Sequence, residues 1–320
     1  MNVGWNEWGG GTLLAVENEN WLAEIALVPG GCPVRLLEKR TATEVFRTPA
    51  NMAALRKEPA VYGMPVLLPP NRIAGGRFQA AGREYRLPVN EPEKGNHLHG
   101  LLLNRPWQLE RETPDGVILL CRFGEDQPEY AGFPHTFEAR RSFEFLPGLF
   151  RHRFELVNRS EAAMPFGLGF HTAFRLPEAE EAFVEIPFRE EGCWAVHPER
   201  RLPTGELRPW SGEELALFRG ERPAGKGAVA AMFPLPPGAA GHRAELRWNG
   251  RRIVYEFDLQ YRHLACWNGG GGAGFFCIEP MSWMTDAPNV DLAPEISGFR
   301  LLAPGERTCF VSTIAVKLPR

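Results

Sequence analysis

The chain of 320 residues contains no uninterrupted apolar run of the roughly 18 residues that a membrane-spanning helix needs. Its first segment, MNVGWNEWGGGTLLAVENENW, has no basic start followed by a long apolar stretch, so we expect no signal peptide. There is also no excess of one charge, because 36 Lys and Arg face 39 Asp and Glu for a formal net charge of −3. This balance gives no electrostatic reason to expect nucleic acid or an anionic membrane surface as a partner. We expect a soluble, cytoplasmic protein.

Cysteine is scarce and scattered. The six cysteines form no C-x-x-C pair, and they are Cys32, Cys121, Cys193, Cys266, Cys277 and Cys309. In a chain of this length such scattered cysteines predict buried free thiols in a reducing compartment rather than a disulfide framework.

Convincing amphipathic helices are few, and the best candidates are two short stretches, 48–57 and 211–220. Short runs of period near two, rich in β-branched and aromatic residues, dominate instead, and they cover 21–29, 137–145, 149–158, 244–259 and 309–318. Asn249-Gly250 is a common two-residue hairpin turn, and the four glycines at 269–272 suggest a hairpin loop. Because no linker stands out, residues 1–320 are predicted to form one mostly antiparallel β domain, either a sandwich or a closed barrel.

Polar residues interrupt this strand-rich pattern at four places. PNRIAGGRF (70–78) carries Arg72, and GNHLHG (95–100) carries two histidines that would point to one face of an extended segment. His171 interrupts the apolar run PFGLGFHTAFRL, and Glu279 ends the apolar run FFCI. A carboxylate at the end of a buried strand is costly unless it is paired or used. Together these side chains are the components of an acid–base site for a polar substrate.

Several of these segments, in this order, resemble the aldose 1-epimerase (galactose mutarotase) family. NRIAGGRFQAAGREYRLPVN followed by NHLHG is similar to the family's asparagine-arginine-isoleucine stretch, hairpin and leucine-histidine-glycine. GFHTAFRL resembles its second histidine segment, and RLPTGEL its proline-threonine-glycine-glutamate element. CIEPMSWMTDAPN resembles its segment with a glutamate followed by Asp-Ala-x-Asn, and LAPGE the start of its last strand. The resemblance implies a large antiparallel β-sandwich, or supersandwich, that holds a hexose in an open cleft without a cofactor.

The resemblance also implies roles for individual residues. Glu279 and His171 match the catalytic carboxylate and the second histidine, His99 matches the first histidine, and Asn71 and Arg72 match the sugar-binding motif. Exchange of α- and β-anomers requires a base for the C1 hydroxyl and an acid for the ring oxygen, and these roles reverse on closure. With Glu279 as the base and His171 as the acid, we expect His171 to titrate near neutrality. His99 and Arg72 would then hold sugar oxygens.

Neighbouring residues receive supporting roles. His97 and His99 could bind a metal on one strand only with further ligands nearby, so the resemblance favours a structural or rim His97 and no metal. Of Trp107, Trp267 and Trp283, we favour Trp283 for stacking on the sugar, because it follows the Glu279 strand. Asp286 and Asn289 are expected to brace the loop after Glu279.

The sequence also departs from the family pattern. The stretch GKGAVAAMFPL (225–235) lacks the family's sugar-binding aspartate, and Gly100 is followed by Leu101 rather than glycine. Recognition of the far sugar hydroxyls is therefore expected to differ. The alternatives are a hexose-6-phosphate 1-epimerase with Arg105 at the phosphate, and a non-catalytic carbohydrate-binding protein. A lyase or glycosidase is also open, although a glycosidase wants two facing carboxylates and we identify only one. A monomer or a homodimer fits the sequence.

Overall fold

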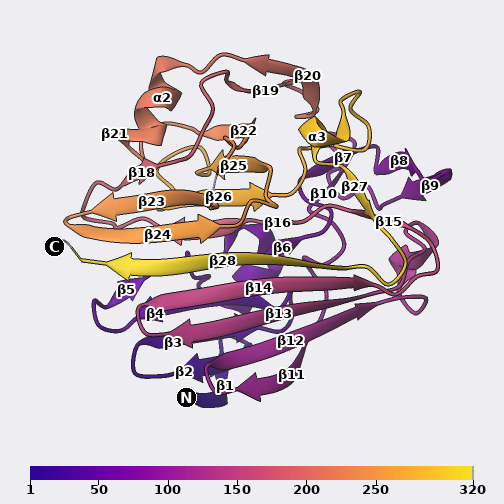
Figure 1. Ribbon diagram of the computed structural model, residues 1–320. Coiled ribbons are helices and arrows are strands. Elements are labelled where there is room, and N and C mark those ends of the chain that lie inside the picture. The colour runs from indigo at the N-terminus through magenta and orange to yellow at the C-terminus, as the bar shows by residue number, and fades with distance from the viewer. Residues whose placement is uncertain (239, 319–320) are drawn as a thin grey trace.

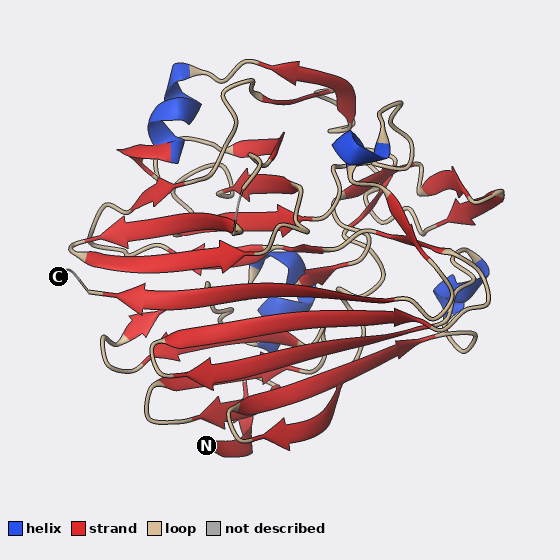
Figure 2. Ribbon diagram, in the orientation of Figure 1, coloured by secondary structure: helices blue, strands red, loops and turns tan. Residues whose placement is uncertain are grey.

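The computed structural model describes residues 1–238 and 240–318, and strands make up most of it (Figures 1 and 2). The strands of its large sheets pair antiparallel, as the alternating sequence pattern predicts. The predicted fold class, a large antiparallel β-sandwich with few short helices, is confirmed.

The largest sheet has nine strands and crosses the front of the molecule in Figure 1. In spatial order its strands are β11 (Gln108–Thr113), β12 (Gly116–Phe123), β13 (Phe137–Leu146), β14 (Leu149–Asn158), β28 (Arg307–Lys317), β24 (Arg251–Phe257), β23 (His242–Trp248), β18 (Phe183–Glu185) and β21 (Arg219–Pro223).

A six-stranded sheet carries the candidate site, and we call it the site sheet. Its order is β22 (Ala230–Pro234), β25 (His263–Trp267), β26 (Phe275–Met281), β16 (Gly169–Phe170) and β6 (Val66–Leu67), and β17 (Thr172–Arg175) also pairs with β26.

The remaining strands form one five-stranded sheet and four pairs. The sheet contains β1 (Asn2–Trp8), β2 (Gly11–Glu17), β3 (Trp21–Ala26), β4 (Cys32–Glu38) and β5 (Thr43–Glu44). The pairs are β7 (Arg72–Ala74) with β10 (Asn96–Leu98), β8 (Arg77–Ala80) with β9 (Arg83–Arg86), β15 (Met164–Phe166) with β27 (Arg300–Leu302), and β19 (Cys193–Val196) with β20 (Pro203–Arg208).

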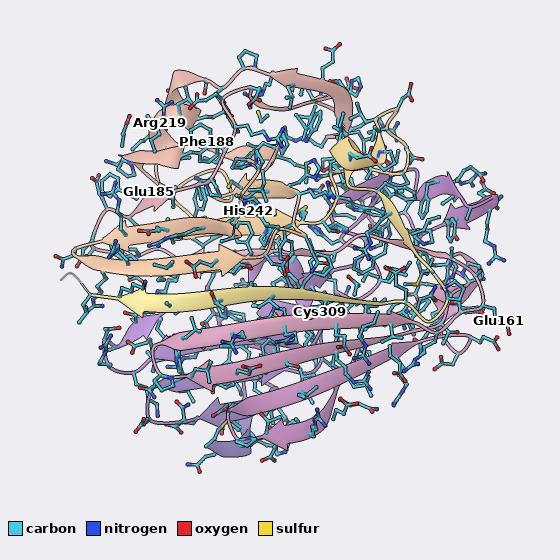
Figure 3. All side chains as sticks on the ribbon, viewed as in Figure 1. Glu161, Glu185, Phe188, Arg219, His242 and Cys309 are labelled. Atoms are coloured by element: carbon cyan, nitrogen blue, oxygen red, sulfur yellow. The ribbon has the colours of Figure 1, made fainter. Side chains whose placement is uncertain are left out.

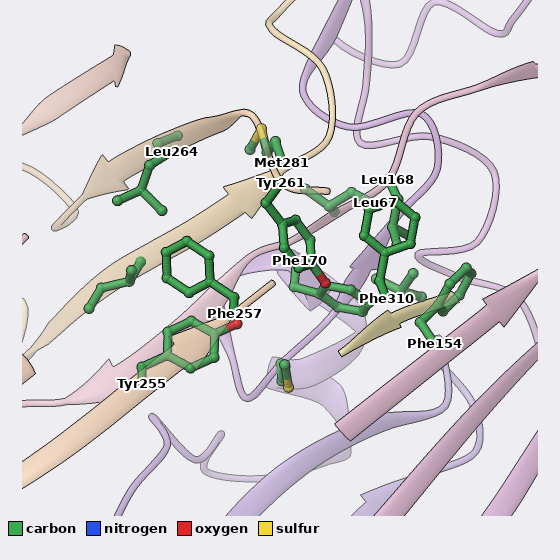
Figure 4. Packing of buried hydrophobic residues seen from close by; sticks show 14 of the residues in the cluster. Leu67, Phe154, Leu168, Phe170, Tyr255, Phe257, Tyr261, Leu264, Met281 and Phe310 are labelled. Carbon is green, nitrogen blue, oxygen red and sulfur yellow. The ribbon is translucent and has the colours of Figure 1, made fainter. Parts of the chain in front are cut away.

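Aromatic side chains fill the space between the nine-stranded sheet and the site sheet (Figure 4). Phe170 of β16 lies with its ring centroid 4.7 Å from that of His152 on β14 and 6.5 Å from that of Tyr261. Tyr261 in turn contacts Phe310 of β28, with centroids 5.1 Å apart. Full burial of one such side chain contributes about 1.5–3 kcal/mol. This packing fixes the site sheet against the nine-stranded sheet.

The predicted hairpins are present. Asn249 and Gly250 join β23 to β24 with φ angles of 41° and 73°, the left-handed pair that a tight hairpin turn requires. The glycine-rich stretch joins β25 to β26, and Asn268 at its start donates to the carbonyls of Ala224 and Gly227. The loop is thus anchored beside one end of the site sheet.

Helices are short, as predicted. They are α1 (Met52–Lys57), α2 (Gly212–Phe218), α3 (Pro294–Ser297) and the 3₁₀ turns Pro59–Val61 and Pro128–Ala131. Ser211 and Glu214 form a capping box at the start of α2, since each side chain bonds the other residue's backbone N–H. Within the described residues, no helix has the length and apolar character needed to cross a bilayer.

All six cysteines are free thiols, and five of them are buried, as predicted. Cys309 is the partly exposed one, and it lies on β28 in Figure 3.

Candidate active site

His171 and Glu279 face each other on the site sheet. Gly169 pairs with Met281 and Thr172 with Ile278, so the register places His171 opposite Glu279. His171 Nε2 lies 3.2 Å from Glu279 Oε1, and the two residues are 5% and 3% exposed. The structure therefore brings together the two residues expected to exchange protons.

Burial shifts the pKa of both groups. Desolvation raises the pKa of Glu279 to about 8, although the positive charge of Arg72 opposes this shift. Desolvation lowers the pKa of His171 to about 4, so the expectation that His171 titrates near neutrality is wrong. Between these two values the pair holds one proton and carries no net charge.

His99 lies beside this pair but leaves the strand that precedes it. The strand ends at Leu98, and His99 takes φ = 67° while its N–H donates to the Asn71 carbonyl. Its ring stands edge-on to that of His171, with centroids 5.3 Å apart. Desolvation, followed by the nearby His171 and Arg72, places the pKa of His99 well below its ordinary value, so His99 is neutral at pH 7.

His97 does not share the direction of His99, contrary to the expectation from their spacing. It is buried, and its Nδ1 lies 2.7 Å from the Pro88 carbonyl. Because the chain turns after Leu98, the rule that alternate residues share a face no longer applies. His97 is a structural residue, as the resemblance favoured.

Arg72 is held by a carboxylate that the sequence analysis missed. Its Nε and Nη2 donate to Glu91 at 2.8 Å each, and Asn96 also donates to Glu91 at 3.0 Å. Burial alone would raise the pKa of Glu91, but hydrogen bonds from Arg72, Asn96 and Lys94 outweigh it and lower that pKa to about 2. Glu91 thus orients the guanidinium that lies near Glu279.

Asn71 supports Arg72 from the turn that precedes it. It has φ = 58°, and its Oδ1 accepts from the Arg72 N–H at 3.0 Å and from Nη1 at 3.4 Å. Asn71 was expected to bind substrate, but its side-chain oxygen accepts both of these hydrogen bonds from Arg72.

The loop after β26 is tied to the Arg72 strand. Asp286 has φ = 58°, donates its N–H to the Arg72 carbonyl, and accepts from the Ala74 N–H at 3.0 Å and from Asn289 Nδ2 at 2.7 Å. Asp286 and Asn289 therefore brace this loop, as predicted. Asn71, His99 and Asp286 all occupy left-handed backbone conformations, which concentrate at functional sites.

Trp283 does not face the site, and its expected contact with substrate is wrong. It is 1% exposed, and its ring stacks on Phe299 with centroids 5.8 Å apart. Gly167 packs so closely that an added Cβ would lie 2.2 Å from the Trp283 ring. Both neighbours are distant in sequence, so the position after the Glu279 strand gave no sign of this burial.

Trp267 lies where Trp283 was expected. It pairs with Cys277 across the site sheet, is partly exposed, and has its ring centroid 5.8 Å from that of His171. A partly exposed indole beside the acid–base pair offers an apolar face to a sugar ring.

The structure bears on the missing aspartate and on the phosphate role considered for Arg105. On β22 the residues in register with Trp267 and Ala265 are Ala230 and Met232, so no carboxylate enters the site from this strand. Arg105 is buried and donates to Glu129 and Gln127, with its guanidinium 4.8 Å from the Phe123 ring centroid. It is thus occupied within the fold, which argues against the phosphate role considered for it.

One group of donor atoms in the described chain is compact enough for a metal ion. Donor atoms of His171, Cys277 and Glu279 lie within 4.8 Å of one another, and all three residues are buried. Burial raises the pKa of the Cys277 thiol well above its ordinary value, so this third donor is a neutral thiol at pH 7. The contact between His171 and Glu279 has the length of a hydrogen bond.

The sequence pattern of the family described as aldose 1-epimerase matches residues 13–314. The chain belongs to the aldose 1-epimerase family. Human galactose mutarotase is 26% identical over 222 residues, which cover 65% of this chain and 61% of the human protein. The uncharacterized protein YphB of Escherichia coli is 26% identical over 253 residues, 77% of this chain and 81% of YphB.

Solved structures agree with this family membership. A galactose mutarotase-like protein from Clostridium acetobutylicum is 27% identical and superimposes with a TM-score of 0.92 over 99% of this chain and 98% of that one. A galactose 1-epimerase from Lactobacillus acidophilus, 15% identical, shares the fold with a TM-score of 0.74 over 100% and 99% of the two chains.

Proposed function

We propose that the protein is an aldose 1-epimerase that interconverts the α- and β-anomers of a hexose. The observation that carries this proposal is the contact of a buried carboxylate with a buried imidazole, Glu279 Oε1 to His171 Nε2, at 3.2 Å. Human galactose mutarotase, among the relatives, is named for this kind of reaction.

Ring opening uses the ion-pair form of the two residues. Glu279 takes the proton of the C1 hydroxyl while the C1–O5 bond breaks, and His171 gives a proton to O5. The products are the open aldehyde, a protonated Glu279 and a neutral His171. Those are the protonation states that burial favours for each group.

Reclosure reverses these transfers on the other face of the aldehyde. After rotation about C1–C2, O5 attacks C1 and returns its proton to His171, while Glu279 gives its proton to the new C1 hydroxyl. No proton is gained or lost over the cycle, and each positioned group contributes about 10²–10⁴-fold to the rate.

Three partly exposed residues surround the pair and suit substrate binding. Arg72 supplies a fixed positive charge near Glu279, His99 a neutral imidazole, and Trp267 an apolar face. In the described part of the chain, Nδ1 of His99 and Nδ1 of His171 are buried without a hydrogen-bond partner.

The test is the optical rotation of freshly dissolved α-D-glucose and α-D-galactose. Catalytic amounts of the protein should accelerate the decay of at least one of them above the rate in buffer. If the protein accelerates the decay of no neutral or acidic aldose, the proposal fails and a non-catalytic carbohydrate-binding protein becomes the better account.

A further inference from the structure

Arg47 is a half-buried cation with no carboxylate within ion-pair distance among the described residues. Its guanidinium carbon lies 4.0 Å from the Phe275 ring centroid and 4.6 Å from that of Tyr62. The side chain makes one hydrogen bond within the described chain, from Nη1 to the Val61 carbonyl at 3.3 Å. A guanidinium has five N–H donors, so most of its capacity is unused.

Two other arginines near the site sheet have anionic partners. Arg72 is paired with Glu91, and Arg175, at the end of β17, is paired with Glu178, with N–O distances of 2.8 Å in both pairs. Within the described residues Arg141, Arg189 and Arg262 also have no carboxylate partner, and they donate to backbone carbonyls. Arg141 is fully buried, whereas Arg47 is half-buried and lies against two aromatic rings beside the catalytic rows.

The backbone places Arg47 next to the catalytic rows of the site sheet. Phe46 bridges to Phe174, and the Arg47 N–H donates to the Ala173 carbonyl at 2.8 Å. Ala173 pairs with Cys277, so Arg47 continues the row that contains Trp267, Cys277 and Ala173. Glu279 and His171 form the neighbouring row.

Cys277 lies between the acid–base pair and Arg47. Its donor atom is within 4.8 Å of those of His171 and Glu279. The charge of Arg47 also acts on Cys277, where it opposes the rise in the thiol pKa that burial and Glu279 cause. Phe275, Cys277 and Glu279 alternate along one face of β26, at intervals of about 7 Å. Along this face, Glu279 and Arg47 therefore lie on opposite sides of Cys277.

Aromatic rings line this path. The His171 ring lies 5.8 Å from that of Trp267, and Trp267 lies 5.3 Å from Phe275, which Arg47 covers. This series suits an apolar sugar face and ends at a positive charge.

Given the proposed function, on which this step rests, we infer that the site prefers aldoses with a carboxylate on C5, that is hexuronates, and that Arg47 binds this carboxylate. In a pyranose C1 and C5 flank the ring oxygen. When the C1 hydroxyl is at Glu279 and the ring oxygen at His171, the group on C5 extends away from Glu279. A planar carboxylate fits the two-pronged donor geometry of a guanidinium.

A single unpaired guanidinium favours a single negative charge. A phosphate ester carries close to two charges at neutral pH and would need a second free cation, but Arg175 and Arg72 are already paired. The pair of Glu279 and His171 carries no net charge near pH 7, so it does not repel an acidic sugar.

The experiment compares sodium D-glucuronate, D-glucose and D-glucose 6-phosphate by NMR exchange of the anomeric protons, after subtraction of the rate without protein. D-Glucuronate and D-glucose differ only at C6, so their ratio of kcat/KM isolates the carboxylate. We expect glucuronate to be preferred, and Arg47→Gln to lower that ratio about 10- to 100-fold, mainly through the KM of glucuronate, because a charge-assisted contact is lost. Arg47→Lys keeps the positive charge but lacks the two-pronged donor geometry. Its ratio of kcat/KM should lie between those of wild type and Arg47→Gln.

Arg153→Gln is the matched control. Arg153 lies on β14 of the nine-stranded sheet, with no carboxylate within ion-pair distance in the described chain, and it donates to Cys309 Sγ at 3.5 Å. It should leave the ratio unchanged. An unchanged ratio in Arg47→Gln overturns the inference, and so does a preference for glucose 6-phosphate over glucuronate.

Binding separates this inference from the proposed function. If no aldose is turned over, the proposed function fails, and calorimetric titration with glucuronate then decides the matter. If wild type and Arg153→Gln bind glucuronate but Arg47→Gln does not, the subsite is supported. If wild type does not bind glucuronate, the inference is overturned.

Discussion

Glu279 Oε1 and His171 Nε2 lie 3.2 Å apart, with both residues buried, Glu279 on β26 and His171 between β16 and β17. This separation lies within ion-pair distance. Burial disfavours the charged form of each group, so the pair retains one proton over a wide pH range. The proposed reaction needs this state, with a base and an acid present together.

The first prediction concerns the pH dependence of kcat/KM. Below about pH 4 both groups are protonated and no base remains, whereas above about pH 8 the pair loses its only proton and no acid remains. The profile should therefore be bell-shaped, with limbs near these two values. Mutarotation rates from pH 3.5 to 9, corrected for the buffer, measure it. An acid limb near pH 6.5, the ordinary value for histidine, would contradict the structure.

The second prediction concerns stability. The pKa of Glu279 is raised in the folded state, from 4.5 to about 8, so the folded protein is favoured by the protonated carboxyl below pH 4.5. As the pH rises through 8 this contribution is lost, and the buried carboxylate becomes a penalty on the folded state. Glu279→Gln removes this penalty and should stabilise the protein relative to wild type at pH 8.5. The gain is on the order of a few kcal/mol at pH 8.5 and vanishes near pH 4.5. Denaturant unfolding at both pH values measures this gain. An equal change in unfolding free energy at pH 4.5 and 8.5 would contradict the raised pKa of Glu279.

The third prediction has the opposite sign. The pKa of Glu91 is lowered to about 2, so its contribution is present above pH 4.5 and is lost as the pH falls through 2. Glu91→Gln should destabilise the protein by about 1–3 kcal/mol at pH 7, because the partly buried Arg72 loses its charged partner. The difference in unfolding free energy between Glu91→Gln and wild type should become smaller between pH 4.5 and 3, and denaturant unfolding at several pH values measures it. A difference that stays constant over this range speaks against the ion pair.

The fourth prediction separates two tryptophans. Trp283→Ala should cost about 3–5 kcal/mol of unfolding free energy, since Trp283 is buried against Gly167 and Phe299. Trp267→Ala should cost much less, because that residue is partly exposed, but it should raise the KM for the sugar. Thermal unfolding and kinetics on the two variants show which tryptophan supports the fold and which one binds the sugar. A raised KM only in Trp283→Ala would reverse these two roles.

Local patterns in the sequence predict much of the fold. The alternation in 137–145 and 149–158 predicts the strands β13 and β14, and Asn249-Gly250 predicts the turn between β23 and β24. These elements depend on neighbouring residues, so their sequence contains the information that places them. The helix candidate 211–220 likewise corresponds to α2 (Gly212–Phe218).

Contacts between distant segments could not be predicted in this way. Glu91 is the partner of Arg72, but its burial depends on the pairing of β7 with β10 and on the Arg200 carbonyl, which accepts from Asn96. Trp283 is buried because Gly167, distant in the chain, leaves room for its ring. The shift of the His171 pKa also depends on its surroundings in space, whereas the sequence shows only an ordinary histidine.

The most direct test of the account is the rate of anomer interconversion with wild type and Glu279→Gln, each shown to be folded by circular dichroism. We predict that wild type accelerates the reaction of its preferred aldose, and that the variant loses about 10²–10⁴-fold of this acceleration because the base is gone. A Glu279→Gln protein with wild-type rates would show that the buried pair with His171 is not the catalytic centre.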